Sequence, residues 1–227
     1  MCGIYGVVDK TTVSREAFIG LGLASKQRGN RTFGYMTAVL SVPAQAPVVR
    51  RFIEPFQPQA VQIGAAQVAL GHNGTPTGGS GGVLTVTAVH PFASRSLLLA
   101  HNGLLLNHEQ SGPAGRLPEV DSQLVLTGIQ QQLDNDIVIE QAIAQTVSRL
   151  EGQQAGWLWY LPTQQLYLWR IMSPLFSLND RQTFHFSSVR FGPVQNLLSE
   201  GIVYRLDPLT LQLTEAATFT FQSPYKT

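Results

Sequence analysis

Apolar runs of strand length alternate with polar, glycine-rich or proline-rich turns along the first hundred residues. The chain begins with IYGVV at residues 4–8, an apolar and β-branched segment that favours a buried strand. Four further segments have the same character, at residues 33–40, 47–53, 62–70 and 96–101. The stretch GHNGTPTGGSGG, which follows residue 70, is so rich in glycine that no regular structure is expected there.

Three other segments have the period of a helix. Residues 14–27 begin at Ser14, a residue type that caps helix N-termini, and end before a glycine. Their expected apolar stripe consists of Phe18, Leu21 and Leu23. Residues 121–133 and 137–150 follow as two further helices, and the second has an apolar face. That face consists of Ile139, Ile143 and Val147.

From residue 156 onward the chain returns to the alternation of strands. Four or five short strands are expected there, separated by Pro, Asn and Asp. Strands on both sides of a helix pair, with little strict βαβ alternation, predict an α+β fold built on antiparallel sheets. No linker or repeat interrupts the pattern, so residues 1–227 are expected to form a single domain.

Composition and charge exclude several classes of protein. The net charge is +1 and no run of Lys or Arg occurs, which argues against nucleic-acid or polybasic membrane binding. No apolar stretch reaches the roughly 20 residues that span a bilayer, and the N-terminus lacks the features of a signal peptide. A cytoplasmic protein is therefore expected. With one cysteine and five histidines that lack ligand spacing, we expect no disulfide, no metal and no other cofactor.

Cys2 combines two reactive groups once the first residue is removed. A small second residue allows the initiator methionine to be trimmed, which leaves a thiol and an α-amine on one residue. The amine, with a pKa of about 7.7–8.0, can take the thiol proton and later deliver it to a leaving group. Cys2 is therefore a candidate N-terminal nucleophile, although a cysteine at this position is inert in most proteins.

Five short motifs occur in a fixed order along the chain. They are CGIYG at 2–6, RGNRTFG at 28–34, GHNGTPTGG at 71–79, AHNGLLLN at 100–107 and DSQ at 121–123. Their order and spacing resemble the glutaminase domain of the class II glutamine amidotransferases, and the segments after residue 156 resemble its closing strands. The resemblance implies an enzyme with the N-terminal nucleophile hydrolase fold, an αββα sandwich of two antiparallel sheets flanked by helices.

The resemblance also implies roles for individual residues. In the family, the N-terminal cysteine attacks the side-chain amide of glutamine and forms a glutamyl thioester. Asn102 and Gly103 would form the oxyanion hole, and Asp121 would bind the α-amino group of glutamine. Arg28 would steady the loop around the nucleophile, and Thr77 is a candidate substrate contact. Taken alone, these residues also fit a turn between strands, a helix cap and a solvated helix end.

Two positions depart from the family pattern. The family has an arginine two residues after the histidine of its substrate loop, where it pairs with the α-carboxylate of glutamine; here that position is Gly74. The family also has an acidic or small polar residue where this chain has Arg31. We expect the α-carboxylate to be bound less strongly, unless another group substitutes for the missing arginine. The candidates are the backbone N–H groups of residues 78–82, which could form an anion-binding concavity, and Arg31 or Arg95.

Three functions are compatible with these residues. The leading hypothesis is a stand-alone glutaminase subunit that supplies ammonia to a separate synthase, since no attached synthase domain is expected. The second is a hydrolase of another γ-glutamyl amide without ammonia transfer. The third is a catalytically silent relative that binds or regulates. Retention of Cys2, Asn102 and Asp121 argues against the third, whereas the missing arginine favours it.

Overall fold

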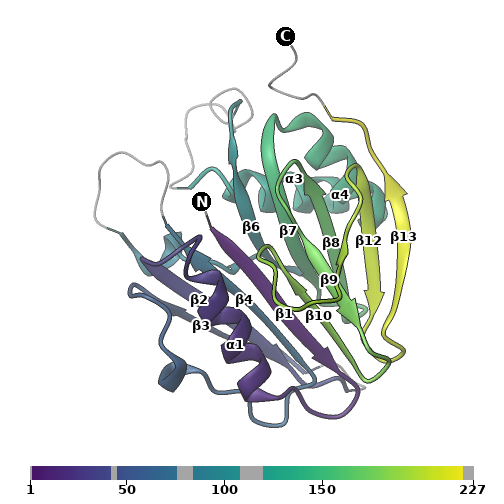
Figure 1. Ribbon diagram of the computed structural model, residues 1–227. Coiled ribbons are helices and arrows are strands. Elements are labelled where there is room, and N and C mark those ends of the chain that lie inside the picture. The colour runs from purple at the N-terminus through teal and green to yellow at the C-terminus, as the bar shows by residue number, and fades with distance from the viewer. Residues whose placement is uncertain (1, 42–44, 76–83, 108–119, 222–227) are drawn as a thin grey trace.

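Two antiparallel sheets face each other, with helices on both outer faces (Figure 1). The computed structural model describes residues 2–41, 45–75, 84–107 and 120–221. In sheet order, the seven-stranded sheet consists of β11 (Asn196–Leu197), β9 (Phe176–Asn179), β10 (Thr183–Ser187), β1 (Gly3–Asp9), β4 (Val68–Gly74), β2 (Thr32–Ala38) and β3 (Val48–Phe52). The six-stranded sheet consists of β13 (Gln212–Thr218), β12 (Ile202–Asp207), β8 (Gln165–Ile171), β7 (Gly152–Tyr160), β6 (Leu97–Leu105) and β5 (Phe92–Ala93).

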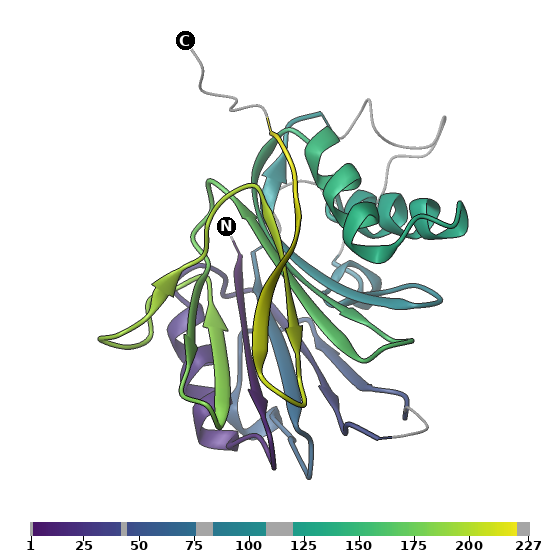
Figure 2. The same cartoon turned by 90° about the vertical axis from the view of Figure 1, so that its right-hand side faces the viewer.

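The helices cover the outer faces of the two sheets. Helix α1 (Arg15–Ser25) packs on the seven-stranded sheet, whereas α3 (Gln123–Asp134) and α4 (Ile139–Arg149) pack on the six-stranded one (Figure 2). Two 3₁₀ turns, η1 (Pro58–Ala60) and η2 (Val86–Ala88), lie in the connections. This arrangement confirms the αββα sandwich that the resemblance implied.

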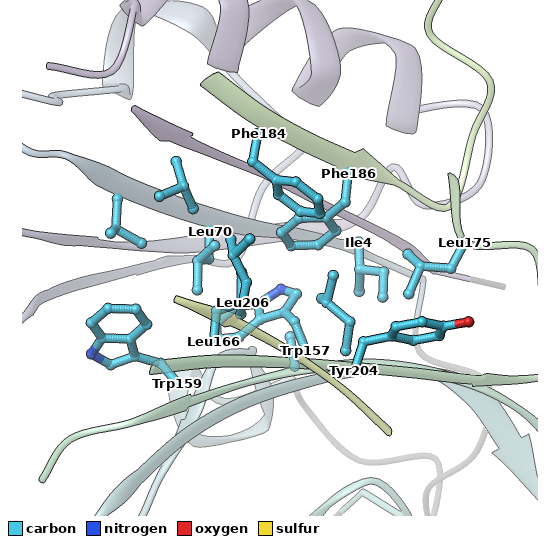
Figure 3. Packing of buried hydrophobic residues seen from close by; sticks show 14 of the residues in the cluster. Ile4, Leu70, Trp157, Trp159, Leu166, Leu175, Phe184, Phe186, Tyr204 and Leu206 are labelled. Carbon is cyan, nitrogen blue, oxygen red and sulfur yellow. The ribbon is translucent and has the colours of Figure 1, made fainter. Parts of the chain in front are cut away.

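Strand alternation produces three hydrophobic layers. Along β1, Ile4 and Val8 face the other sheet, whereas Tyr5 and Val7 pack beneath α1. The central layer is filled by large side chains from both sheets, with Trp157 directly opposite the strands of the first sheet (Figure 3). Burial of this layer fixes the distance between β1 and β6, and these are the strands beside which the candidate reactive residues lie.

Several predicted elements are confirmed. Ser14 caps α1, and its hydroxyl accepts a hydrogen bond from the backbone N–H of Ala17. The predicted apolar face of α4 is buried. The stripe predicted on α1 is wrong at Leu23, which is 46% exposed, because the helix turns that position away from the sheet. Instead, Gly22 faces the core and allows the ring of Phe56 to pack against the helix backbone.

Three strand predictions need correction. The strand expected at 62–70 is β4, which begins at Val68 and continues through the glycine-rich residues 71–74. Glycine is accommodated there because the ring of Tyr5 packs on Gly71, whose carbonyl accepts a hydrogen bond from Trp157. The strand expected to end at residue 101 also continues, as β6, to Leu105. After residue 151 the described residues contain seven strands, not the four or five expected, because the short β9 and β11 were missed.

Candidate active site

Cys2 lies at the end of β1, opposite β6 of the other sheet. Its backbone N–H donates a hydrogen bond to the side-chain oxygen Oδ1 of Asn102, at 3.0 Å. Its thiol contacts the carbonyl oxygen of Thr75, with the sulfur 3.7 Å away. The thiol is half-buried, and this burial raises its pKa above the ordinary value. A thiol with a raised pKa stays protonated near neutral pH, so it needs a base before it can attack.

Asn102 lies in the interior of β6 and is 1% exposed. Alternation places its side chain with Ala100, in the space between the sheets. Its oxygen is occupied by the Cys2 N–H, and its buried Nδ2 has no hydrogen-bond partner among the described residues. The hairpin turn that Asn-Gly suggests by itself is therefore absent, because both residues are part of one continuous strand.

The backbone of Gly103 lies at an edge of β6 that no strand of the described residues covers. The N–H of Leu105 points away from β7, toward the carboxylate of Asp121, and alternation directs the N–H of Gly103 to the same edge. β5 pairs only with Leu98 and Leu99, so it does not cover that edge at Gly103. A Cβ atom at Gly103 would lie 2.2 Å from the carbonyl oxygen of Gln153, so a side chain is excluded.

Asp121 lies just before α3 and bonds to the edge of β6. Its Oδ2 accepts the N–H of Leu105 at 3.0 Å, and its Oδ1 accepts the N–H of Ser122 at 2.7 Å. Three ion pairs occur among the described residues, and none includes Asp121. Among the described residues this carboxylate therefore has neutral hydrogen-bond donors but no ion-pair partner, and a ligand ammonium would supply one.

Arg28 contacts the backbone of the candidate nucleophile Cys2. It follows α1, and its Nε donates to the carbonyl oxygen of Cys2 at 3.1 Å. Two residues further along, in β1, the N–H of Ile4 donates to the hydroxyl of Ser188, which follows β10, and the N–H of Ser188 donates to the carbonyl of Ile4. These contacts fix the backbone that directly follows the thiol. The remaining candidate, Thr77, lies outside the described residues.

Three buried histidines lie between these groups. His72 and His90 have ring centroids 4.0 Å apart, and Nδ1 of His101 lies 2.9 Å from the hydroxyl of Ser122. Burial lowers the pKa of His72 to about 3 and that of His101 to about 4. Both rings are therefore neutral at neutral pH. In the described ranges, no three His, Cys, Asp or Glu side chains are arranged to hold a metal ion.

The environment of Gly74 shows what occupies the place of the missing arginine. A Cβ atom at Gly74 would lie 2.4 Å from the hydroxyl of Thr32 and 3.1 Å from the ring of His72. Arg31 is adjacent, and its N–H donates to the carbonyl of Gly74 at 2.9 Å. Arg31 itself lies one residue before β2 and is exposed.

Arg95 is engaged elsewhere. It forms an exposed ion pair with Asp134 of α3, with 2.6 Å between Nη2 and Oδ1. The described residues thus bring Cys2, Asn102, Gly103 and Arg28 together, but they place neither substitute cation beside the thiol.

Two contacts at this site were not predicted. The carbonyl of Thr75 is a backbone group, and the residue type gives no signal for it. Ser122 was included in the DSQ motif, but no role was assigned to it. A hydroxyl directly after a candidate carboxylate is a signal that could have identified it.

The chain is similar in sequence or fold to several known proteins. No protein-family profile matches the chain. The glutamine–fructose-6-phosphate aminotransferases of Bacillus thuringiensis and Bacillus cereus are each 27% identical to it over 187 residues, which cover 77% of this chain. The chain spans only 30% of the length of these relatives.

Solved structures share the fold. Glutamine phosphoribosylpyrophosphate amidotransferase from Bacillus subtilis superposes with a TM-score of 0.69 at 16% identity, over 94% of this chain and 49% of that one. A glutamine aminotransferase class II domain protein from Silicibacter pomeroyi gives 0.60 at 16% identity, over 95% of this chain and 100% of that one. The fold is therefore that of the N-terminal nucleophile hydrolases.

Sequence and fold point to the same group of proteins. The chain is similar in sequence to the glutamine–fructose-6-phosphate aminotransferases and shares its fold with glutamine amidotransferases of known structure. Among the described residues, no helix combines the length and apolar character needed to cross a membrane.

Proposed function

We propose that this protein is a glutaminase that hydrolyses the side-chain amide of glutamine through a thioester on Cys2. One observation carries the proposal. The nitrogen of Cys2 is 3.0 Å from Oδ1 of Asn102, while the buried Nδ2 of the same amide has no partner among the described residues. A single side chain thus orients the base and presents a donor beside the thiol.

The reaction begins with proton transfer within residue 2. With Met1 removed, the α-amine of Cys2 accepts the thiol proton, because burial keeps the thiol protonated otherwise. The sulfur then attacks the amide carbon of glutamine, and the carbonyl oxygen becomes an oxyanion. Nδ2 of Asn102 and the N–H of Gly103 are the two donors that would stabilise it.

Collapse of this intermediate releases ammonia. The ammonium form of the Cys2 amine donates its proton to the departing nitrogen, and the C–N bond breaks to leave the glutamyl thioester. Water then attacks the thioester after giving a proton to the same amine, and glutamate leaves as the thiol is restored. Arg28 holds the Cys2 carbonyl during both steps.

Substrate recognition is unequal at the two ends of the amino-acid group. Asp121 lacks a cation among the described residues and would bind the α-ammonium of glutamine. Gly74 supplies no side chain for the α-carboxylate, and Thr77 remains a candidate contact. We infer that glutamine is bound mainly through its amine and its side-chain amide.

The ammonia would be used by a separate acceptor enzyme, and we place both proteins in the cytoplasm. The homologous aminotransferases are longer than this chain, and their remaining length is not matched by it. A glutaminase of this kind would pass its ammonia to a synthase partner or release it into solution as a free product.

Ammonia release tests the proposal directly. Protein that begins at Cys2 is compared with the same protein carrying Cys2→Ala, and both are incubated with glutamine. We expect glutamate and ammonia in equal amounts from the first and none from the second. Equal activity of a chain that retains Met1, verified by intact mass, would contradict the role of the α-amine.

A further inference from the structure

A chain of hydrogen bonds runs from a buried imidazole to the carboxylate of Asp121. The hydroxyl of Ser122 donates to Oδ1 of Asp121 at 3.3 Å, and Nδ1 of His101 lies 2.9 Å from the same hydroxyl. A hydroxyl has one proton to donate. Because that proton points to the carboxylate, Nδ1 of His101 carries the proton of the neutral ring and donates to Ser122.

Ser122 and His101, the two residues that lead to the carboxylate, are both buried and belong to different parts of the fold. Ser122 is 4% exposed and precedes α3, whereas His101 is 1% exposed and lies in β6. Hydrogen bonds in series polarise one another, so His101 strengthens the bond from Ser122 to the carboxylate. The chain therefore holds one oxygen of Asp121 while the N–H of Leu105 holds the other.

The same imidazole also bounds the proposed oxyanion hole. His101 directly precedes Asn102, and its ring is so near Gly103 that a Cβ atom there would lie 2.7 Å from Cε1. The ring that orients the carboxylate is thus packed against the backbone of the proposed oxyanion donor.

We propose that Ser122 and His101 are positioning residues for amine recognition by Asp121. They fix the carboxylate against β6. The group that would bind the substrate amine and the donors that would bind its amide oxygen are therefore held at a constant distance from each other. This inference rests on the proposed function, since it assigns a supporting network to the same site. It predicts that loss of Ser122 weakens binding only of ligands that carry an α-amine.

The ligand concentration that halves the rate of Cys2 alkylation gives an apparent dissociation constant, which for glutamine is measured during turnover. Iodoacetamide modifies the thiol, and a bound ligand slows the modification. The two ligands are glutamine and glutaramate, which has the same skeleton without the α-amine. In Ser122→Ala we expect the dissociation constant of glutamine to rise about tenfold, because a hydrogen bond to a charged group is lost. That of glutaramate should change less than twofold.

Matched variants separate positioning from folding. Ser148→Ala removes a hydroxyl from α4 that bonds the carbonyl of Gln145, and it should leave both constants unchanged. Ser122→Thr keeps the hydroxyl and should restore glutamine binding. His101→Asn places a polar nitrogen where Nδ1 lies and should retain most of it, whereas His101→Phe should resemble Ser122→Ala.

The outcomes divide clearly. An equal loss for both ligands in Ser122→Ala would mean a merely structural role, and no loss for either would mean that the hydroxyl is irrelevant; each overturns the inference. Failure of glutamine to protect wild-type Cys2 at all would instead overturn the proposed function, whatever Ser122 does.

Discussion

The surroundings of Cys2 and those of Gly74, two neighbouring parts of the candidate site, differ in how many of the expected functional groups they contain. Around Cys2, the proposed nucleophile, the Asn102 amide and the Arg28 guanidinium hold the backbone of residue 2, and the backbone of Gly103 directly follows Asn102. Around Gly74, the corresponding space holds the hydroxyl of Thr32 and the ring of His72, and neither β1 nor β2, the two strands paired with β4, contains an arginine.

The difference teaches which parts of such a site are linked to the fold. The donors at Cys2 come from strand backbones and from side chains that are buried between the sheets, so their positions follow from the core. A carboxylate-binding side chain, in contrast, extends from the end of a strand. It can be lost without disturbing the register of β4 with β1 and β2.

Cys2→Ala should have the largest effect on the first of these parts. We expect no detectable ammonia release from glutamine, because no other thiol is present in the chain. The fold should be retained, since the change replaces one small terminal side chain with another. Thermal unfolding monitored by circular dichroism provides the control, and residual hydrolysis above the buffer rate would contradict the assignment.

Asn102→Ala should come next. It removes one proposed oxyanion donor and the acceptor of the Cys2 nitrogen. We expect turnover to fall by about 10²–10³, with a smaller change in the Michaelis constant. Steady-state kinetics with glutamine distinguish the two parameters. A rise in the Michaelis constant alone would show that the amide binds substrate and does not stabilise the oxyanion.

The second part, around Gly74, predicts weak reading of the α-carboxylate. Glutamine should be preferred over glutaminamide, in which this carboxylate is neutralised, by less than about tenfold in kcat/KM, because a charge-assisted bidentate pair is absent. Arg31→Ala and Arg95→Ala should each change the ratio less than about twofold. Strong discrimination that disappears in Arg31→Ala would reveal that this arginine reaches the site after all.

Restoring the arginine should sharpen the comparison. Gly74→Arg alone should destabilise the protein, because its Cβ atom would collide with the hydroxyl of Thr32. The double variant with Thr32→Ala removes that obstacle. We expect it to increase the preference for glutamine over glutaminamide about tenfold or more. Equal ratios in the double variant and in the Thr32→Ala control would contradict this reading of the site.

The smallest effect concerns pH and the histidines between the two parts. His72 and His101 stay neutral in the folded state down to a pKa of about 3 and about 4, whereas in the unfolded chain they titrate near 6.5. Below pH 6.5 the unfolded chain binds protons at these two rings while the folded protein does not. The free energy of unfolding is therefore unaffected by them above pH 6.5 and decreases as the pH falls below it. Near pH 5, each histidine should lower the free energy of unfolding by about 1.4 kcal/mol for every unit by which the pH falls.

Urea unfolding at several pH values checks this slope. His72→Gln replaces one titrating ring with a group that does not bind protons, so it should make the pH dependence shallower by about one proton. An unchanged slope would mean that His72 is protonated or solvated in the folded protein.

The sequence predicted the layers of the fold better than the edges of its strands. The periods of apolar residues identified α1, α4 and β1, because burial on one face leaves a regular pattern. The pattern failed at residues 71–74, where glycines in β4 make room for neighbouring rings instead of contributing side chains. Packing between strands decides such a segment, and local composition does not record it.

The candidate site was predicted mainly through resemblance. Local reasoning alone left Asn102 and Gly103 as a turn, and the structure places them within β6. The contact between the Cys2 nitrogen and Asn102 joins residues 100 positions apart, and no local pattern reveals a pair at that separation. The absence of an arginine at position 74 could be predicted, because the amino-acid sequence alone shows that this residue is a glycine.

The continuity of β6 sets the distance between two groups of the candidate site. The N–H groups of Gly103 and Leu105 point to the same edge, and two residues of strand separate them by roughly 6.8 Å. One marks the position of the amide oxygen in the proposed reaction, and the other anchors the carboxylate of Asp121 that would bind the amine. Asparagine is one methylene shorter than glutamine. In the proposed reaction asparagine could not reach both positions at once, so the spacing of the two N–H groups would favour the longer amino acid.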